Sequence, residues 1–338
     1  MTLSARTIMR NSCRQHSRPL NILSFPTHER YQTNLAKTGH NFYLWQGSQG
    51  IKPWVEEYAG VPEGTVLMNP SKGQNQIPDH VDIDLILSQN KFGQFSVSRQ
   101  LSEQLGVPLV SIEHTLPMSS WPQSYIEELH SMQGDINIFI SDYSRAEWGW
   151  SEDEAYVIHH GIDSESFCPP LNEDDRSDAV LSVVNDWINR DWCCGFRLWQ
   201  SITDFPNNKI ELRIIGDTPG LSKPAKSTED LITKYQQSRI FLNTSLISPV
   251  PTALLEAMSC GCAVVTTGTC MIPEIIKNGE NGFMSNDVKE LRGYVDKLLN
   301  DKKLCSEMGK NARNTIIENF GINNFVESWN EVFSGCVE

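Results

Sequence analysis

Short apolar runs alternate with amphipathic stretches along the chain, and this alternation predicts its elements. Unbroken apolar runs of about five residues are typical of strands buried on both faces of a parallel sheet. Apolar residues at three- and four-residue spacing are typical of helices. The predicted strands are 21–25, 41–45, 83–87, 107–112, 135–140, 156–158, 179–184, 212–215, 240–242 and 262–267. The predicted helices are 31–37, 95–105, one from about Cys194, 231–238, 252–260, 288–299, 303–318 and 324–333.

Strands and helices recur about every 25–30 residues, which indicates doubly wound parallel sheets. Residues 46–80 are rich in Gly, Pro and Gln, and they are predicted to form surface loops with at most short helices. Pro and acidic residues gather around 167–176, which predicts a linker. A chain of 338 residues is too long for one ordinary core. The predicted parts are a basic extension at 1–18, a Rossmann-like domain at 19–170, a second at 177–320 and a terminal segment at 321–338.

The most informative stretch is 240–285. Pro251 just before the predicted helix 252–260 and Gly261 just after it match the usual asymmetry of helix ends. The run CAVVTT then predicts a buried strand. In a strand, helix, strand unit the N–H groups at the helix start can bind a phosphate. Glu256 follows Thr252 on the same face, about 6 Å along the axis, which is the offset of a ribose from its phosphates. A solvated or ion-paired Glu is the alternative interpretation.

The motifs of this stretch resemble a known enzyme family. They are LLEAMSCGCAVV around Glu256, then IPE ending at Glu274, then NGENGF from Asn278 to Phe283. In this order and spacing they resemble the retaining group 1 glycosyltransferases of the GT-B fold. One position departs from the family, which has a first glutamate where this chain has Ser248.

The resemblance implies a GT-B fold, with two Rossmann-like doubly wound parallel-sheet domains facing an interdomain cleft and a terminal helix that crosses back to the first domain. It implies that the second domain binds the donor, with the base near Gly216 and Asp217 and the ribose on Glu256. Ser248 or local backbone would then contact the sugar. The phosphates would lie on the helix start, formed by Pro251, Thr252, Ala253 and Leu254.

Three further positions are candidates for chemistry. Arg190 is the cation of the segment NDWINRDWCCGF and is predicted to clamp phosphate, while a surface pairing with Asp186 or Asp191 is the alternative. His114 follows a predicted strand and resembles a family His beside the donor sugar, although a strand-end His is often structural. His160 and Gly161 resemble the hinge-side motif V-I-x-N-G-V-D, and a simple turn is the alternative.

Composition narrows the function classes. The 28 basic and 42 acidic residues give a net charge of −14, which disfavours a nucleic-acid acceptor. The sequence has no apolar run of 18 residues, so no membrane-spanning helix is predicted. Residues 1–18 lack the apolar core of a secretory signal. The nine cysteines lack metal-ligand spacing and are expected to be thiols in the cytoplasm. The Asp82-Ile83-Asp84 motif heads a predicted strand, so no metal site is expected.

The favoured hypothesis is a metal-independent glycosyltransferase without a cofactor. It would move a sugar from a nucleotide-diphosphate sugar to a glycan or other hydroxyl acceptor with retention of configuration, and peripheral membrane contact stays open. The alternative is a degenerate GT-B protein that binds a nucleotide sugar or glycan without catalysis, because Ser248 replaces the family glutamate. An NAD-dependent oxidoreductase would suit the Rossmann-like pattern, but the chain lacks G-x-G-x-x-G.

Overall fold

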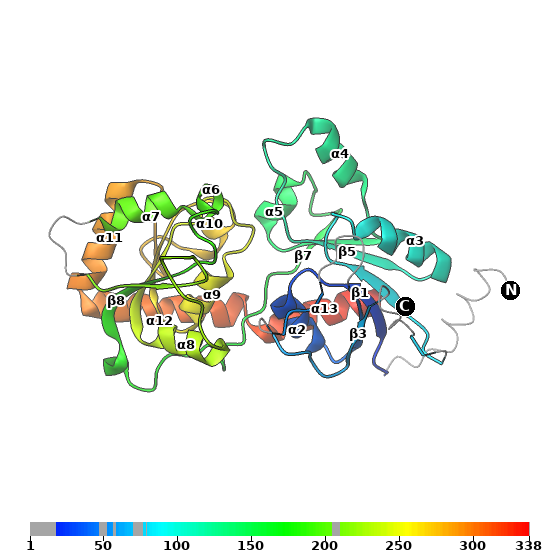
Figure 1. Cartoon of the computed structure of the whole chain (residues 1–338), viewed down its shortest axis with the longest axis horizontal. Helices are drawn as coiled ribbons and strands as arrows, with labels where there is room; N and C mark the ends of the chain where they lie inside the picture. The colour runs from blue at the N-terminus through cyan, green and yellow to red at the C-terminus, as the bar shows by residue number, and fades with distance from the viewer. Residues whose placement is uncertain are drawn as a thin grey trace. The chain divides into compact units, whose positions relative to one another are not determined.

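The computed structural model describes residues 18–46, 53–56, 59–69, 77–78, 80–204 and 210–337. Its contacts divide the chain into two compact units. The first runs up to His159 and takes in the chain again from Phe325, and the second is His160–Asn324 (Figure 1). The predicted extension 1–18 lies outside the described residues apart from Arg18, which pairs with Asp84 at 2.9 Å. Within the described ranges no helix is long and apolar enough to cross a membrane.

The first unit is built on a parallel sheet in the order β3-β2-β1-β4-β5-β6-β7. Its strands are β1 Asn21–Phe25, β2 Asn41–Trp45, β3 Thr65–Met68, β4 Leu85–Ser88, β5 Leu109–Glu113, β6 Ile136–Phe139 and β7 Tyr156–Val157. Its helices are α2 Glu29–Ala36, α3 Phe95–Leu105, α4 Gln123–Ser131, α5 Asp142–Glu147 and most of α13 Ile322–Gly335. Strands β1, β2, β4 and β5 are almost wholly buried, as their unbroken apolar sequences predict.

Strand β3 corrects one prediction. The composition of residues 46–80 predicts loops, yet Thr65–Met68 pairs in parallel with β2 at the edge of the sheet. The strand has only four residues, and Val66 is 47% exposed. A short edge strand with a solvent-facing apolar residue lacks a clear hydrophobic pattern, so only its pairing with β2 reveals it.

The second unit has a five-stranded parallel sheet in the order β12-β11-β10-β8-β9. Its strands are β8 Ser177–Val183, β9 Leu212–Ile215, β10 Ser238–Asn243, β11 Ala263–Thr266 and β12 Phe283–Met284. Its helical segments are η2 Glu173–Asp175, α6 Asp191–Cys194, α7 Phe196–Thr203, α8 Thr228–Gln236, α9 Thr252–Ser259, α10 Ile272–Ile275, α11 Val288–Asn300 and α12 Lys302–Asn319.

Alternate residues of the central strands face two apolar layers. In β10, Phe241 packs into a cluster with residues of α8 and α9, whereas Ile240 and Leu242 pack into a second cluster with residues of α7 and α11. The two clusters lie on opposite faces of the sheet because successive strand side chains point in opposite directions. The second unit is therefore a three-layer α/β/α arrangement.

Two predicted helices have different bounds in the structure. The helix predicted from about Cys194 is two helices, α6 and α7, separated by Gly195 with φ +64°. The helix predicted at 231–238 begins earlier, because the Ser227 hydroxyl caps it by accepting from the Asp230 N–H at 3.2 Å. It ends at Gln236, and Ser238 already belongs to β10.

The segment predicted as a linker is packed into the second unit. Arg313 of α12 donates to the backbone carbonyls of Ser164 and Phe167 at 3.0 and 3.1 Å. The Ser259 hydroxyl also donates to the Phe167 carbonyl at 2.7 Å. The division between the units therefore falls after His159, ahead of the Pro-rich and acidic residues, because those residues are tied to α9 and α12.

Candidate active site

One edge of the second sheet gathers the residues predicted to bind the donor. Strands β8, β9 and β10 end at Val183, Ile215 and Asn243, and since they are parallel, the loops that follow them lie at the same edge. These loops and the start of α9 carry Arg190, Gly216, Asp217, Ser248, Pro251, Thr252, Ala253 and Leu254. The topology thus brings these candidates to one end of the second unit.

The loops after β8 and β9 are joined by short polar contacts. The Asp186 N–H donates to Asp217 Oδ1 at 2.6 Å, and the Trp187 N–H donates to the Thr218 hydroxyl at 2.9 Å. Gly216 has φ +146°, and a Cβ at this position would overlap the Val184 carbonyl oxygen. Gly216 is therefore required for the close approach of the two loops. The assignment of Gly216 and Asp217 to a nucleotide base stays a prediction.

The loop that carries Ser248 is held against α6. The N–H groups of Leu246 and Ile247 both donate to the Cys193 carbonyl, at 2.8 and 3.1 Å. A Cβ on Gly195 would overlap the Thr244 carbonyl, so only glycine lets the two segments approach this closely. These contacts couple the segment containing Arg190 to the half-buried Ser248 at the edge of the sheet.

Arg190 lies at the start of α6 and is exposed to solvent. Its guanidinium group donates to the Asn185 carbonyl at 3.5 Å. The two acids that could have paired with it have other partners, since Asp186 accepts from Asn189 at 2.7 Å and Asp191 pairs with Arg197 at 3.4 Å. The alternative that Arg190 is a surface residue paired with either acid therefore finds no support in these contacts.

Glu256 is buried within the second unit. It lies in the second turn of α9, its residue is 6% exposed, and its Oε2 accepts from the hydroxyl of Tyr235 at 2.9 Å. Tyr235 belongs to α8 and is fully buried. This is not the solvated helix-face glutamate of the alternative interpretation. Tyr235 is not predicted from the sequence, because its pairing with Glu256 joins two helices that are separated by β10.

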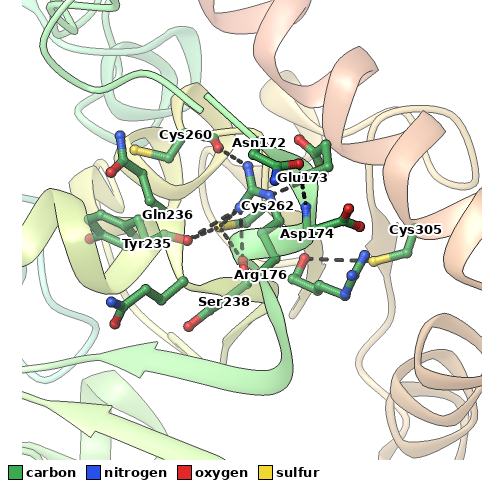
Figure 2. A network of polar contacts seen from close by, with 12 residues as sticks. Asn172, Glu173, Asp174, Arg176, Tyr235, Gln236, Ser238, Cys260, Cys262 and Cys305 are labelled. Carbon is green, nitrogen blue, oxygen red and sulfur yellow. Dashed lines mark hydrogen bonds and ion pairs between the residues drawn. The ribbon is translucent and has the colours of Figure 1, made fainter. Parts of the chain in front are cut away.

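Two arginines stabilise the other end of α9. Arg176 is 5% exposed and donates to the carbonyls of Cys260, Ser238 and Tyr235 at 2.5, 2.9 and 3.3 Å (Figure 2). Arg313 donates to the Ser259 carbonyl at 2.6 Å. These cations satisfy carbonyls at the helix C-terminus and complement its negative dipole end. Neither arginine is predicted from the sequence, since neither lies near the motif that it supports.

In the first unit, His114 follows β5 in a loop whose backbone is fixed on both sides. Glu113 Oε1 accepts from the N–H and the hydroxyl of Thr115, both at 2.7 Å. Trp148 Nε1 donates to the Thr115 carbonyl at 3.0 Å. The ring of His114 is buried and meets the rings of Tyr31 and His28 edge to face, with centroids 4.5 and 5.7 Å apart. His114 thus has a defined position at the carboxyl end of β5.

A buried lysine and a buried glutamate lie beside this loop. The Lys91 N–H donates to Glu113 Oε2 at 3.1 Å, and the Lys91 ammonium donates to the Met132 carbonyl and lies over the rings of Phe95 and Trp150. Burial lowers the pKa of Lys91 to about 8, although the charge of Glu113 acts in the opposite direction. Burial also raises the pKa of Glu113 above its usual range, against hydrogen bonds from Thr115 and the charge of Lys91.

His160 and Gly161 begin the second unit. His160 is half-buried and Gly161 is buried. The next residue, Ile162, makes two backbone hydrogen bonds to the turn before α13. Its N–H donates to the Phe320 carbonyl at 2.7 Å, and its carbonyl accepts from the Ile322 N–H at 3.0 Å. The position of these residues is therefore fixed by the chain that leads into α13, and a contact with the donor stays a prediction.

The described cysteines are all reduced. Burial raises the pKa of Cys194 and Cys305 to about 12 and that of Cys262 to about 11, so these thiols are protonated at neutral pH. Among the residues that the structure describes, no three His, Cys, Asp or Glu side chains are grouped as a metal site would require. The chemical roles of Arg190, Glu256, His114 and the start of α9 stay predictions.

Comparison with known proteins places part of the chain beside a described family. Residues 221–315 match the family model described as "Glycosyl transferases group 1". The matched range includes the end of the loop that follows β9, together with α9 and β11. This part of the chain is therefore similar to the group 1 glycosyltransferases. The chain is 21% identical over 285 residues to an uncharacterized glycosyltransferase of Methanocaldococcus jannaschii, a match that covers 77% of each chain. It is 24% identical over 212 residues to the Escherichia coli UDP-Gal:alpha-D-GlcNAc-diphosphoundecaprenol alpha-1,3-galactosyltransferase, with 54% of each chain covered.

Solved structures show that the chain has the GT-B fold. Anabaena HepE in complex with UDP superposes with a TM-score of 0.77 at 15% identity, covering 94% of this chain and all of the other. Sucrose-phosphate synthase of Thermosynechococcus elongatus superposes with a TM-score of 0.70 at 14% identity, covering 94% and 99% of the two chains. The predicted fold class, with two parallel-sheet α/β domains, is confirmed.

Proposed function

We propose that this protein is a glycosyltransferase that moves a sugar from a nucleotide-diphosphate sugar to a hydroxyl acceptor with retention of anomeric configuration. The observation that carries the proposal is the buried Glu256 carboxylate, oriented by Tyr235, one turn beyond the start of α9. A helix start and a carboxylate one turn further on suit a diphosphate and the hydroxyl groups of its ribose. UDP sugars are the first donors to test, because Anabaena HepE was solved with UDP and the Escherichia coli relative uses UDP-Gal.

In the proposed reaction, the bond between the anomeric carbon and the donor phosphate oxygen breaks while the acceptor oxygen bonds to the same face of that carbon. The acceptor proton passes to the departing phosphate oxygen, and the products are the glycoside and the nucleotide diphosphate. Arg190 and the N–H groups at the start of α9 would stabilise the charge that develops on the leaving group. His114 would contact the donor sugar. No metal ion takes part in this proposal.

The decisive experiment measures release of nucleotide diphosphate from UDP-glucose, UDP-galactose, UDP-N-acetylglucosamine and GDP-mannose, with and without a panel of glycan acceptors. Arg190→Ala should lower kcat with little change in melting temperature. Arg197→Ala is the matched control, because its side chain is 87% exposed and follows Arg190 by seven positions. An Arg190→Ala variant with the control's rate would refute the phosphate role.

A second candidate function is binding without turnover, and Ser248 in place of the family glutamate favours it. Measurements of donor binding and of UDP release together distinguish binding alone from sugar transfer. A protein that binds UDP sugars by calorimetry, loses this binding in Glu256→Gln and yet releases no UDP with any acceptor would support binding alone. Glu256→Gln preserves the shape and an acceptor for the Tyr235 hydroxyl, so it removes only the charge. We expect it to weaken donor binding roughly 10- to 100-fold, since a hydrogen bond to a charged group contributes about 1.5–3 kcal/mol.

A further inference from the structure

An aromatic chain in the first unit leads from the terminal helix to His114. Tyr31 of α2 meets His114 edge to face at 4.5 Å between centroids and an interplanar angle of 80°. On its other side Tyr31 meets Phe325 of α13 edge to face at 5.3 Å. The indole N–H of Trp329 donates to the Tyr31 hydroxyl at 3.1 Å. Phe325 and Trp329 lie one turn apart on α13, so a single helix face holds Tyr31 from two directions.

A polar contact and a ring contact within this aromatic chain together fix the orientation of the Tyr31 ring. Tyr31 is 3% exposed and Trp329 is fully buried. A purely apolar pair would fill the same space without the cost of burying a hydroxyl and an indole N–H. The Trp329 to Tyr31 hydrogen bond fixes where the phenol oxygen lies, and with it the axis of the Tyr31 ring, while the edge-to-face contact with Phe325 restricts the plane of the ring. That plane is the surface against which the His114 ring packs.

The His114 backbone has a separate support. Glu113 and Trp148 hold Thr115 on the far side of His114 through the hydrogen bonds given above. With the backbone fixed in this way, the remaining freedom of His114 is rotation about its side-chain torsions. Tyr31 limits that rotation on the buried side, and the exposed His28 contacts the ring at 5.7 Å.

We propose that Tyr31 and Trp329 are positioning residues that hold the imidazole of His114 in the orientation needed to contact the donor sugar. This inference rests on the proposed function, because it assigns His114 a role in transfer. In this proposal the terminal helix α13 also orients a functional side chain, because its residues Phe325 and Trp329 contact Tyr31 and Tyr31 contacts His114. Neither Tyr31 nor Trp329 touches the substrate in this proposal.

The test compares single and combined variants of the full chain. Tyr31→Phe and Trp329→Phe remove one partner each of the hydrogen bond while retaining an aromatic ring. Each should lower kcat for transfer on the order of tenfold, because small misplacement of a catalytic group has effects of this size. The donor KM should stay near the wild-type value. Tyr43→Phe is the matched control, since Tyr43 is 8% exposed and lies in β2, away from this aromatic chain.

Combination with His114→Gln decides between positioning and packing. If Tyr31 acts through His114, Tyr31→Phe should leave the residual rate of His114→Gln unchanged, so the two effects are not additive. An equal loss in both backgrounds would overturn the proposal, and so would a fall in melting temperature with kcat preserved.

A measurement without substrate keeps the orientation claim separate from the proposed reaction. In the NMR spectrum of the full chain labelled at histidine ring carbons, the His114 signal is identified by its loss in His114→Gln. Trp329→Phe should move that signal, because a reoriented Tyr31 ring changes the ring current at the imidazole, whereas Tyr43→Phe should not. A chain that lacks transferase activity but shows this shift would refute the proposed function alone. An unmoved signal would refute the positioning role.

Discussion

Replacement of Arg176 by Met should severely destabilise the second unit. The guanidinium group is buried at the C-terminus of α9, where it donates to the carbonyls of Cys260, Ser238 and Tyr235 and pairs with Glu173 at 3.2 Å (Figure 2). Methionine fills similar space but donates no hydrogen bond, so all three carbonyls lose this donor. Because these groups lie in α8, in β10 and at the C-cap of α9, the loss reaches the helix proposed to bind phosphate.

The magnitude follows from the burial of the partners. A hydrogen bond to a charged group contributes about 1.5–3 kcal/mol, and breaking a buried charged arrangement costs roughly 3–5 kcal/mol. Glu173 adds little, because its side chain is 50% exposed and water can replace the arginine. We therefore expect a loss of about 3–5 kcal/mol in the free energy of unfolding. For a unit of this size that corresponds to a fall of roughly 10 °C in melting temperature.

Thermal and urea unfolding of the full chain, followed by fluorescence and circular dichroism, measure this loss. Arg197→Met is the matched control, because that guanidinium is 87% exposed and its pairing with Asp191 should contribute under about 1 kcal/mol. A loss below about 1 kcal/mol in Arg176→Met would show that water or rearranged side chains satisfy the three carbonyls. It would refute the claim that Arg176 stabilises the end of α9.

Three further predictions concern other parts of the chain. Gly216→Ala should lower the free energy of unfolding by at least about 2 kcal/mol in the urea assay, since a Cβ there would overlap the Val184 carbonyl. Gly220→Ala is the control and should cost less, because Gly220 also has a positive φ but has open space around it. Burial lowers the pKa of Lys91 from 10.5 to about 8, so the unfolded chain binds more protons between these pH values. Wild type should therefore gain stability relative to Lys91→Met as the pH rises through that window, and parallel pH profiles would contradict this. Tyr235→Phe should lower the melting temperature. It should also weaken donor binding, measured by calorimetry with UDP sugars, but by a smaller factor than Glu256→Gln does.

Several elements were determined by local sequence. The helix α9, bounded by Pro251 and Gly261, and the strand β11 after it have nearly the bounds that their pattern predicts. Strand β2 and helix α3 have the predicted bounds, the latter closed by Gly106 with φ +64°. Such elements are predictable because periodicity and capping act over a few neighbouring residues.

Other features depended on contacts between distant segments. Strand β3 exists by pairing with β2, and residues 160–176 belong to the second unit because Arg176 and Arg313 tie them to α9 and neighbouring carbonyls. Tyr235 meets Glu256 because the fold packs α8 next to α9. These contacts join residues whose own neighbours in the chain give no sign of the partner.

The sequence by itself determined that strands and helices alternate in two parallel-sheet domains, and it marked the α9 motif, because both follow from local patterns of apolar residues, glycine and proline. The tertiary structure decided which groups are buried together. It brought the Glu256 carboxylate within hydrogen-bonding distance of the Tyr235 hydroxyl, and it packed the His114 ring against the Tyr31 ring. Burial makes such polar pairings obligatory, and only the packed chain decides which side chains meet.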